Sequence, residues 1–183
     1  LGGDDPYSAS KACSEIVTSA YRNSFFSETG IKLASVRAGN VIGGGDWASD
    51  RLIPDFIRSI NSNRTLKVRS PQAIRPWQHV LEPLSGYLLL AEKLVKDGKI
   101  FAEAWNFGPE QSCAKKVSWV LDRLSKKFID AKWEIENTKH HHETGILKLD
   151  ISKSKSKLGW LPQWSLGTAI DKTEEWNKAF EDN

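Results

Sequence analysis

Tyr7 and Lys11, a tyrosine and a lysine four residues apart, are the side chains in this sequence best suited to chemistry. Each residue of a helix turns by ~100°, so the two lie about 40° apart around the axis and can enter one cleft. A nearby ammonium favours the charged form of a phenol, which makes tyrosinate a usable general base. Such pairs are also common on solvated helix faces, so the spacing alone leaves a structural role open.

Three further polar residues are candidates for binding a ligand. Asn40 follows an expected strand over 31–39, and open α/β sheets bind ligands where their strands end. Arg75 precedes Pro76, which favours an extended backbone, and the fork of N–H donors on its side chain matches a diphosphate. Arg51 lies near an expected helix start, where the helix dipole disfavours a cation, so it needs an anionic partner. A turn residue at Asn40 and a surface salt bridge at Arg75 are the structural alternatives.

Trp77 and His79 alternate with Arg75, so the three side chains are expected on one side of an extended segment. Trp77 could stack on a base or a sugar, or it could pack in the core. His79 could donate to a phosphate or a hydroxyl, or it could be a satisfied structural histidine. The run His140–His142 is not expected to bind a metal, because adjacent histidines do not converge on one ion without further ligands.

The helix that carries Tyr7 and Lys11 is expected to begin at Asp4-Asp5-Pro6 and to end at Thr29-Gly30. Its apolar and small residues are centred nearly opposite the direction of Tyr7 and Lys11. We therefore expect one side of the helix to be buried against protein and the other to face a ligand. The stripe consists of Ala9, Ala12, Cys13, Ile16, Val17, Ala20 and Ser24.

The rest of the chain alternates between helical patterns and short apolar strands, which is typical of an α/β protein. In the loop over 40–50, Gly43–Gly45 could let the backbone approach a ligand, or the loop could simply be flexible. The run Ser152–Lys157 is expected to be a solvated helix face. Helices are expected over 51–62, 82–96, 114–128, 152–158 and 166–180, and strands or extended segments over 66–69, 75–80, 104–109 and 132–136.

The composition excludes several functional classes. The chain has 183 residues, which suffices for one or two small domains with a core. A net charge of +3 with dispersed lysines argues against a nucleic-acid partner. No apolar run approaches membrane-spanning length, so no membrane partner is expected. Cys13 and Cys113 form neither a disulfide framework nor a metal motif, which fits a reduced, cytoplasmic protein.

Four strings together resemble the extended short-chain dehydrogenase/reductase family that acts on nucleotide sugars. Tyr7-Ser-Ala-Ser-Lys11 resembles the Tyr-x-x-x-Lys motif of this family. The strings GNVIGGGDW and RPWQHVLEP are much narrower and favour a nucleotide-sugar 4,6-dehydratase over an epimerase. These two strings lie within the second and third of the four matching segments. After Tyr7–Lys11, the matching segments are Arg37–Trp47 with Arg51–Asp55, Ile74–Pro83, and His142-Glu143 with Leu149-Asp150 and Leu158–Trp160.

The resemblance implies a Rossmann-like doubly wound sheet, NAD as the cofactor and a smaller α/β domain that binds a nucleotide sugar. NAD would stay bound while Tyr7 takes the proton of the sugar 4-hydroxyl and water is eliminated across carbons 5 and 6. Lys11 would hold the nicotinamide ribose. Another NAD-dependent nucleotide-sugar epimerase or dehydratase and a non-catalytic nucleotide-sugar-binding protein remain alternatives. The implied cofactor-binding residues are Tyr7, Lys11, Asn40 and Val41, and the implied substrate-binding residues are Asn40, Arg51, Arg75, Trp77, His79 and His142.

No glycine fingerprint for a dinucleotide follows a strand, and the sequence has no methionine, even at position 1. We therefore expect the chain to be a carboxy-terminal fragment whose amino-terminal half is missing. Residues 1–41 would be the remnant of the NAD-binding domain, and residues 42–183 mainly the nucleotide-sugar-binding region, with 81–109 packing back on the first domain. The isolated chain is expected to be inactive, and the full-length protein a homodimer or homotetramer.

Overall fold

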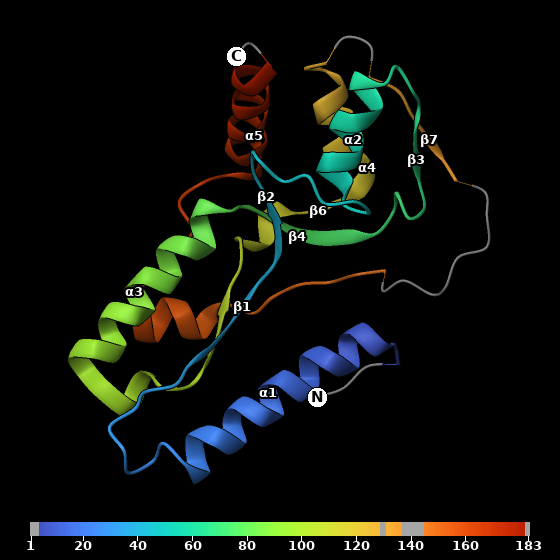
Figure 1. The fold of residues 1–183 in the computed structure, drawn as a ribbon. Helices are drawn as coiled ribbons and strands as arrows, with labels where there is room; N and C mark the ends of the chain where they lie inside the picture. The colour runs from blue at the N-terminus through green and yellow to red at the C-terminus, as the bar shows by residue number, and fades with distance from the viewer. Residues whose placement is uncertain (1–3, 129–130, 137–144, 182–183) are drawn as a thin grey trace. The chain divides into compact units, whose positions relative to one another are not determined.

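The computed structural model describes residues 4–128, 131–136 and 145–181 (Figure 1). The chain forms two compact units, each assembled from three separate segments. The first unit comprises Leu1–Ala38, Pro83–Phe107 and Asp150–Leu161. The second comprises Gly39–Glu82, Gly108–Leu149 and Pro162–Asn183.

The first unit is built on two parallel strands, β1 and β5, which pair from Ser35 with Ala104 to Ala38 with Phe107. Its core is aromatic, because the rings of Phe107 and Trp160 meet edge to face with their centroids 5.1 Å apart. Gly86 lies against the Phe107 ring, where a Cβ atom would clash. The elements of this unit are α1 (Pro6–Ser24), β1 (Ser35–Ala38), α3 (Leu81–Asp97, whose first two residues belong to the second unit), η1 (Gly98–Phe101), β5 (Ala104–Phe107) and η3 (Ser154–Leu158).

The second unit contains a three-stranded sheet in the order β2-β4-β6 and a parallel strand pair, β3 and β7. The strand β4 is central, since it pairs parallel with β2 and antiparallel with β6. The elements are β2 (Asn40–Ile42), α2 (Leu52–Asn61), β3 (Leu66–Val68), β4 (Ile74–His79), η2 (Gln111–Cys113), β6 (Ala114–Lys116), α4 (Val117–Ser125), β7 (Trp133–Ile135) and α5 (Leu166–Glu181).

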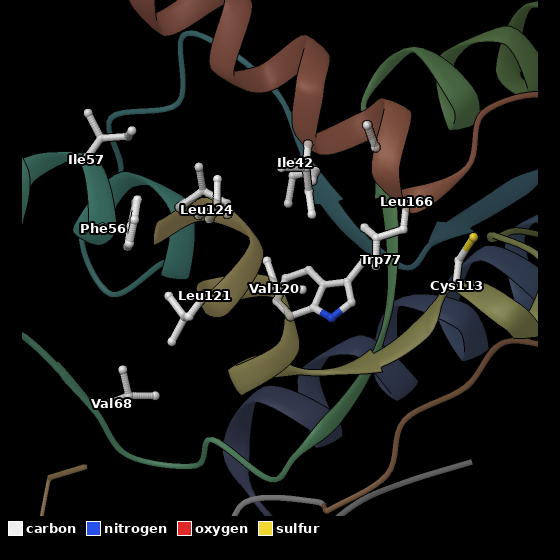
Figure 2. Close-up of a cluster of buried hydrophobic side chains, with 13 residues drawn as sticks. Ile42, Phe56, Ile57, Val68, Trp77, Cys113, Val120, Leu121, Leu124 and Leu166 are labelled. Atoms are coloured by element: carbon white, nitrogen blue, oxygen red, sulfur yellow. The ribbon is translucent and has the colours of Figure 1, made fainter. Parts of the chain in front are cut away.

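The core of the second unit lies between α2, α4 and the sheet (Figure 2). Helix α4 contributes residues at helical spacing, so one of its faces is apolar. The indole N–H of Trp77 donates to the carbonyl oxygen of Lys115 at 3.0 Å, which gives the buried ring its polar partner. The cluster includes Ile42, Phe56, Ile57, Val68, Trp77, Cys113, Val120, Leu121, Leu124 and Leu166.

Helix α1 begins as the sequence predicts, because Asp5 caps it by accepting the backbone N–H of Ser8 at 2.9 Å. It ends at Ser24 rather than at Thr29-Gly30. None of its residues is buried, and Ile16 and Val17 are 53% and 54% exposed, so the prediction of a buried apolar stripe is wrong in this structure.

Polar side chains on another face of α1 make the contacts that explain this difference. The Glu15 carboxylate accepts hydrogen bonds from Ser35 Oγ and Arg37 Nε, both at 2.8 Å. The Nε of Arg22 donates to the carbonyl oxygen of Leu33 at 2.7 Å. These bonds direct the polar side of the helix to β1 and to the segment that precedes it.

Three further expectations for local structure are corrected. Asn40 begins strand β2 rather than a loop, because Asn40–Ile42 pairs with β4. The first residues of the predicted helix over 114–128 form β6 and pair with β4 instead, so a tertiary partner overrides the helical pattern. Ser154 is fully buried and its hydroxyl donates to the carbonyl oxygen of Asn106 at 2.5 Å, so the run Ser152–Lys157 is not a uniformly solvated face.

The last residue of β4, His79, and Glu82 just after the strand are buried titratable side chains. The Glu82 carboxylate accepts the backbone N–H groups of Gln163 and Trp164 at 2.9 and 2.8 Å, which anchors the chain ahead of α5. The ring of His79 lies 4.8 Å from that of Trp164, and its Nδ1 accepts the backbone N–H of Leu81. Burial lowers the pKa of His79 below its ordinary value of 6.5, while the nearby Glu82 charge opposes the shift.

This burial predicts an acid-sensitive contribution to stability. Because the pKa of His79 is lower in the folded chain, the unfolded chain binds more protons once the pH falls below about 6.5. The free energy of unfolding should be highest above that pH and should fall as the pH drops towards the folded-state pKa. One proton changes it by at most about 1.4 kcal/mol per pH unit.

The measurement is urea unfolding at a series of pH values between about 7.5 and 5.5, a window that spans the ordinary histidine pKa. The His79→Gln variant keeps a polar side chain that does not titrate there, so its pH slope should be smaller than that of the wild type. Equal slopes in the two proteins would contradict the prediction.

Candidate active site

Tyr7 and Lys11 lie in the first turns of α1, directly after the Asp5 cap. The Lys11 ammonium is 5.5 Å from the centroid of the Tyr7 ring, so the two heads lie on the same side of the helix. Tyr7 is 71% exposed. The phenol and the ammonium can therefore meet a ligand together, as the spacing predicts, and both can hydrogen-bond to its hydroxyl groups.

Asn40 and Val41 begin β2 and lie opposite Trp77 and Gln78 of β4 in the parallel pair. Asn40 is half-buried and Val41 is 38% exposed. They belong to the second unit, as do all the other described candidates except Tyr7 and Lys11, which belong to the first.

The glycines after β2 are required by packing. A Cβ on Gly43 would come within 2.9 Å of Cγ1 of Val80, and a Cβ on Gly44 would overlap the indole of Trp176. Gly45 has a φ of +74°, which a side chain would strain. The structure thus favours close backbone approach over a merely flexible loop, although the approaching groups are protein side chains.

Arg51 stands at the start of α2, and its Nη1 donates to Asp46 Oδ2 at 3.0 Å. The anionic partner that its position predicts is thus found in the chain itself. A residue that the sequence analysis missed lies nearby, because Arg58 donates to the carbonyl oxygens of Trp47 and Ala48, both at 3.0 Å. Nothing in the local sequence around Arg58 indicates this contact, since its acceptors lie a full loop away.

Arg75, Trp77 and His79 are 7%, 4% and 7% exposed. Arg75 is therefore buried rather than on the surface, and Trp77 takes the core position that the sequence left open beside stacking. The alternation of Arg75, Trp77 and His79 along the strand does not leave their side of it exposed. β4 is the central strand of its sheet, and the intervening Gln78 is also buried.

Lys115 is a second residue that the sequence analysis missed. It lies opposite Arg75 in the antiparallel pair β4–β6, which places the two cationic side chains on the same face. Like charges opposite one another repel, so this arrangement suits an anionic ligand. Only the strand pairing reveals it, because the two residues are far apart in the sequence.

His142 lies outside the described residues, as do His140 and His141. Within the described ranges, no group of three or more His, Cys, Asp or Glu side chains is arranged to hold a metal ion. Among the helices of the described part of the chain, none combines the length and the apolar character needed to span a membrane.

Known structures share this fold along nearly the whole chain. The dTDP-glucose 4,6-dehydratase of Bacillus anthracis, solved with NAD, matches with a TM-score of 0.78 and 19% identity over 100% of this chain and 55% of its own. An epimerase of Methanothermobacter thermautotrophicus matches with a TM-score of 0.83 and 18% identity over 100% of this chain and 52% of its own. The predicted α/β, Rossmann-like fold class is confirmed.

Curated relatives match at the sequence level. The CDP-glucose 4,6-dehydratase of Salmonella typhimurium is 51% identical over 186 residues, which cover 98% of this chain and 52% of that protein. The dTDP-glucose 4,6-dehydratase of Escherichia coli is 27% identical over 183 residues, which cover 93% of this chain and 48% of that protein. The chain spans about half the length of these relatives.

One family model extends along most of the sequence. It describes the GDP-mannose 4,6-dehydratases, and it matches residues 1–173. The Tyr7–Lys11 pair and the segments around Asn40 and Arg75 all lie inside the matched range. The chain is therefore a member of the GDP-mannose 4,6-dehydratase family.

Proposed function

We propose that this chain is part of a longer, NAD-dependent enzyme that dehydrates CDP-glucose to CDP-4-keto-6-deoxyglucose. The observation that carries the proposal is the 51% identity to the Salmonella CDP-glucose 4,6-dehydratase along 98% of this chain. The exposed Tyr7–Lys11 pair supports it, because it supplies a base and a cation on one side of a helix.

Tyr7 acts as the base that takes the proton from the sugar 4-hydroxyl. Lys11 binds the ribose hydroxyls of the cofactor, and its positive charge favours the tyrosinate form of Tyr7. The chemistry that NAD would supply at this site is hydride transfer, out of carbon 4 of the sugar and back to carbon 6. The donors fit this cofactor, since an ammonium and a phenol on one exposed face can both bond to hydroxyl groups. Asn40 and Val41 complete the proposed cofactor set.

The substrate diphosphate binds to Arg75, with Lys115 as a second cation opposite it. His79 is a donor in this proposal, because its Nδ1 accepts the Leu81 N–H and the proton of the neutral ring must then be on Nε2. Arg51, Asn40 and His142 remain proposed substrate contacts. Trp77 is not a proposed substrate contact, since its ring packs in the core.

The division between cofactor and substrate regions follows the same proposal. We assign residues 1–41 to the NAD-binding domain and 42–183 mainly to the nucleotide-sugar-binding region, with 81–109 returning to the first. The grouping of Leu1–Ala38 with Pro83–Phe107 in one compact unit supports this division. The longer protein would act as a cytoplasmic homodimer or homotetramer, and the isolated chain would be inactive.

Incubation of the full-length protein with NAD and either CDP-glucose, GDP-mannose or UDP-glucose tests the reaction. A 4,6-dehydratase releases one water, so its product is lighter than the substrate, whereas a 4-epimerase leaves the mass unchanged. We expect loss of water from CDP-glucose at the highest kcat/KM. Preference for GDP-mannose, which the family model favours, would reassign the substrate. Binding of CDP-glucose without turnover would indicate a non-catalytic protein.

The role of Tyr7 predicts that Tyr7→Phe in the full-length enzyme lowers kcat by about 10²-fold or more, since the base is lost. The affinities for NAD and CDP-glucose should stay nearly unchanged, which calorimetry would show. Tyr21→Phe is the matched control, because Tyr21 is an exposed tyrosine on the same helix. Turnover by Tyr7→Phe within about threefold of the control would remove Tyr7 from the mechanism.

The role of Arg75 predicts a loss of substrate affinity. Replacing a cation that binds a diphosphate in a partly desolvated site weakens binding by ~2–4 kcal/mol, so Arg75→Ala should raise the KM for CDP-glucose far more than it lowers kcat. Arg75→Lys should recover part of the affinity, because a single ammonium does not reproduce the two-pronged fork.

Arg75 is buried, so Arg75→Met, which keeps volume without charge, separates lost charge from lost packing. Arg64→Ala controls for the removal of an arginine from the same unit at an exposed position. A KM in Arg75→Met equal to that of the wild type would show that Arg75 has a structural role only.

A further inference from the structure

The loop Gly43–Trp47 packs directly against helix α5. The backbone of Gly44 lies on the indole of Trp176, where a Cβ would overlap Cγ and Cδ2 of the ring. A Cβ on Gly45 would be 3.4 and 3.5 Å from Cζ2 and Cη2 of the same ring. The indole therefore covers two successive glycines, and only residues without a side chain allow this contact at Gly44.

Three aromatic rings, those of Trp47, Trp176 and Phe180, extend this contact. Trp176 and Phe180 stack one helical turn apart, with centroids 5.2 Å apart and planes 9° apart. Trp47, at the end of the loop, lies 6.1 Å from Trp176 and 5.2 Å from Phe180. The rings connect the loop to α5, although none of them belongs to the buried core.

Other contacts hold the far end of the loop. The Asp46 carboxylate accepts the backbone N–H of Ala48 at 3.1 Å and the Nη1 of Arg51 at 3.0 Å. Arg58 holds the carbonyl oxygens of Trp47 and Ala48. In contrast, the Trp176 indole covers Gly44 and Gly45 themselves, which have no side chains with which to anchor the backbone.

Three consecutive glycines have more accessible backbone conformations than any other tripeptide, so their path must be imposed from outside. The loop begins after Asn40–Ile42 and leads to Arg51, and our proposed function assigns Asn40 and Arg51 to the ligand. A displacement of about 1 Å in groups that orient a substrate can cost up to 10²-fold in rate or binding.

We propose that Trp176 is a positioning residue for the nucleotide sugar, which acts by holding the loop Gly43–Trp47 between Asn40 and Arg51. This inference rests on the proposed function. Trp176 touches the loop and not the ligand, so its removal alters substrate binding through the path of the backbone.

The first test uses the full-length enzyme and the steady-state kinetics of CDP-glucose. Trp176→Ala should raise the KM by about tenfold while kcat changes by less than about threefold, because the base at Tyr7 is untouched. Trp176→Phe keeps an aromatic ring and should restore most of the affinity. Trp133→Ala is the matched control, since Trp133 is a half-buried tryptophan on strand β7 of the same unit.

The second test is a double-mutant cycle through the contact itself. Gly44→Ala sets a methyl group against the indole and should raise the KM even though Trp176 is present. Trp176→Gly removes all three atoms that the methyl would approach most closely, the Cβ at 2.6 Å included, so Gly44→Ala with Trp176→Gly should give a KM no higher than that of Trp176→Gly alone. This non-additivity is what a direct contact requires, and Gly44→Ala alone, which keeps Trp176, tests the contact if Trp176→Gly folds poorly.

The outcomes separate the two proposals. If the wild type and Trp133→Ala dehydrate CDP-glucose and Trp176→Ala has the same KM, the positioning role is overturned and the proposed function stands. Independent, multiplying effects of Gly44→Ala and Trp176→Gly on the KM would also overturn it. If the wild type does not act on a nucleotide sugar, the proposed function fails and the positioning role fails with it.

Discussion

The pairing of β4 with β2 on one side and β6 on the other is the constraint on which the second unit depends. A central strand is buried on both faces, so each of its residues must find a partner in the interior. The parallel pairing places Asn40 opposite Trp77, and the antiparallel pairing places Lys115 opposite Arg75. Trp77 connects the two pairings, because it lies opposite Asn40 and its indole N–H donates to the carbonyl oxygen of Lys115. Its ring packs in the core.

Burying charged and titratable groups is costly, and the unit compensates for this cost locally. Glu82 is 5% exposed, but its carboxylate accepts two backbone N–H groups. His79 adapts differently: burial lowers its pKa and so favours the neutral ring, whose Nδ1 serves as an acceptor. The Glu82 hydrogen bonds and the ring contact of His79 with Trp164 connect the end of β4 to the segment that leads into α5. Strand β4 carries Arg75, which we propose binds the diphosphate. It is thereby connected to helix α5, whose Trp176 covers Gly44 and Gly45.

The two units place their proposed functional residues on different kinds of element. In the first, α1 exposes its tyrosine and lysine and contacts β1 through the polar residues Glu15 and Arg22. In the second, the proposed ligand-binding residues come from a sheet and from the loop that follows its first strand.

The sequence by itself determined the local features of this protein. The Asp5 cap, the helix that becomes α2, the Tyr7–Lys11 spacing and the family all follow from neighbouring residues or from short strings. The α/β class follows too, because alternating helices and apolar strands are a property of the chain read in order.

The tertiary structure alone decided which distant segments meet. Nothing near residue 114 indicates that a strand precedes helix α4, because β6 exists only through its pairing with β4. Likewise, the glycine run indicates that some group comes close to the backbone, but it does not name Trp176, which lies at the other end of the sequence. Helix caps and spacings depend on bonds within a few residues, whereas strand partners and packing contacts depend on the whole chain, so only the folded structure determines them.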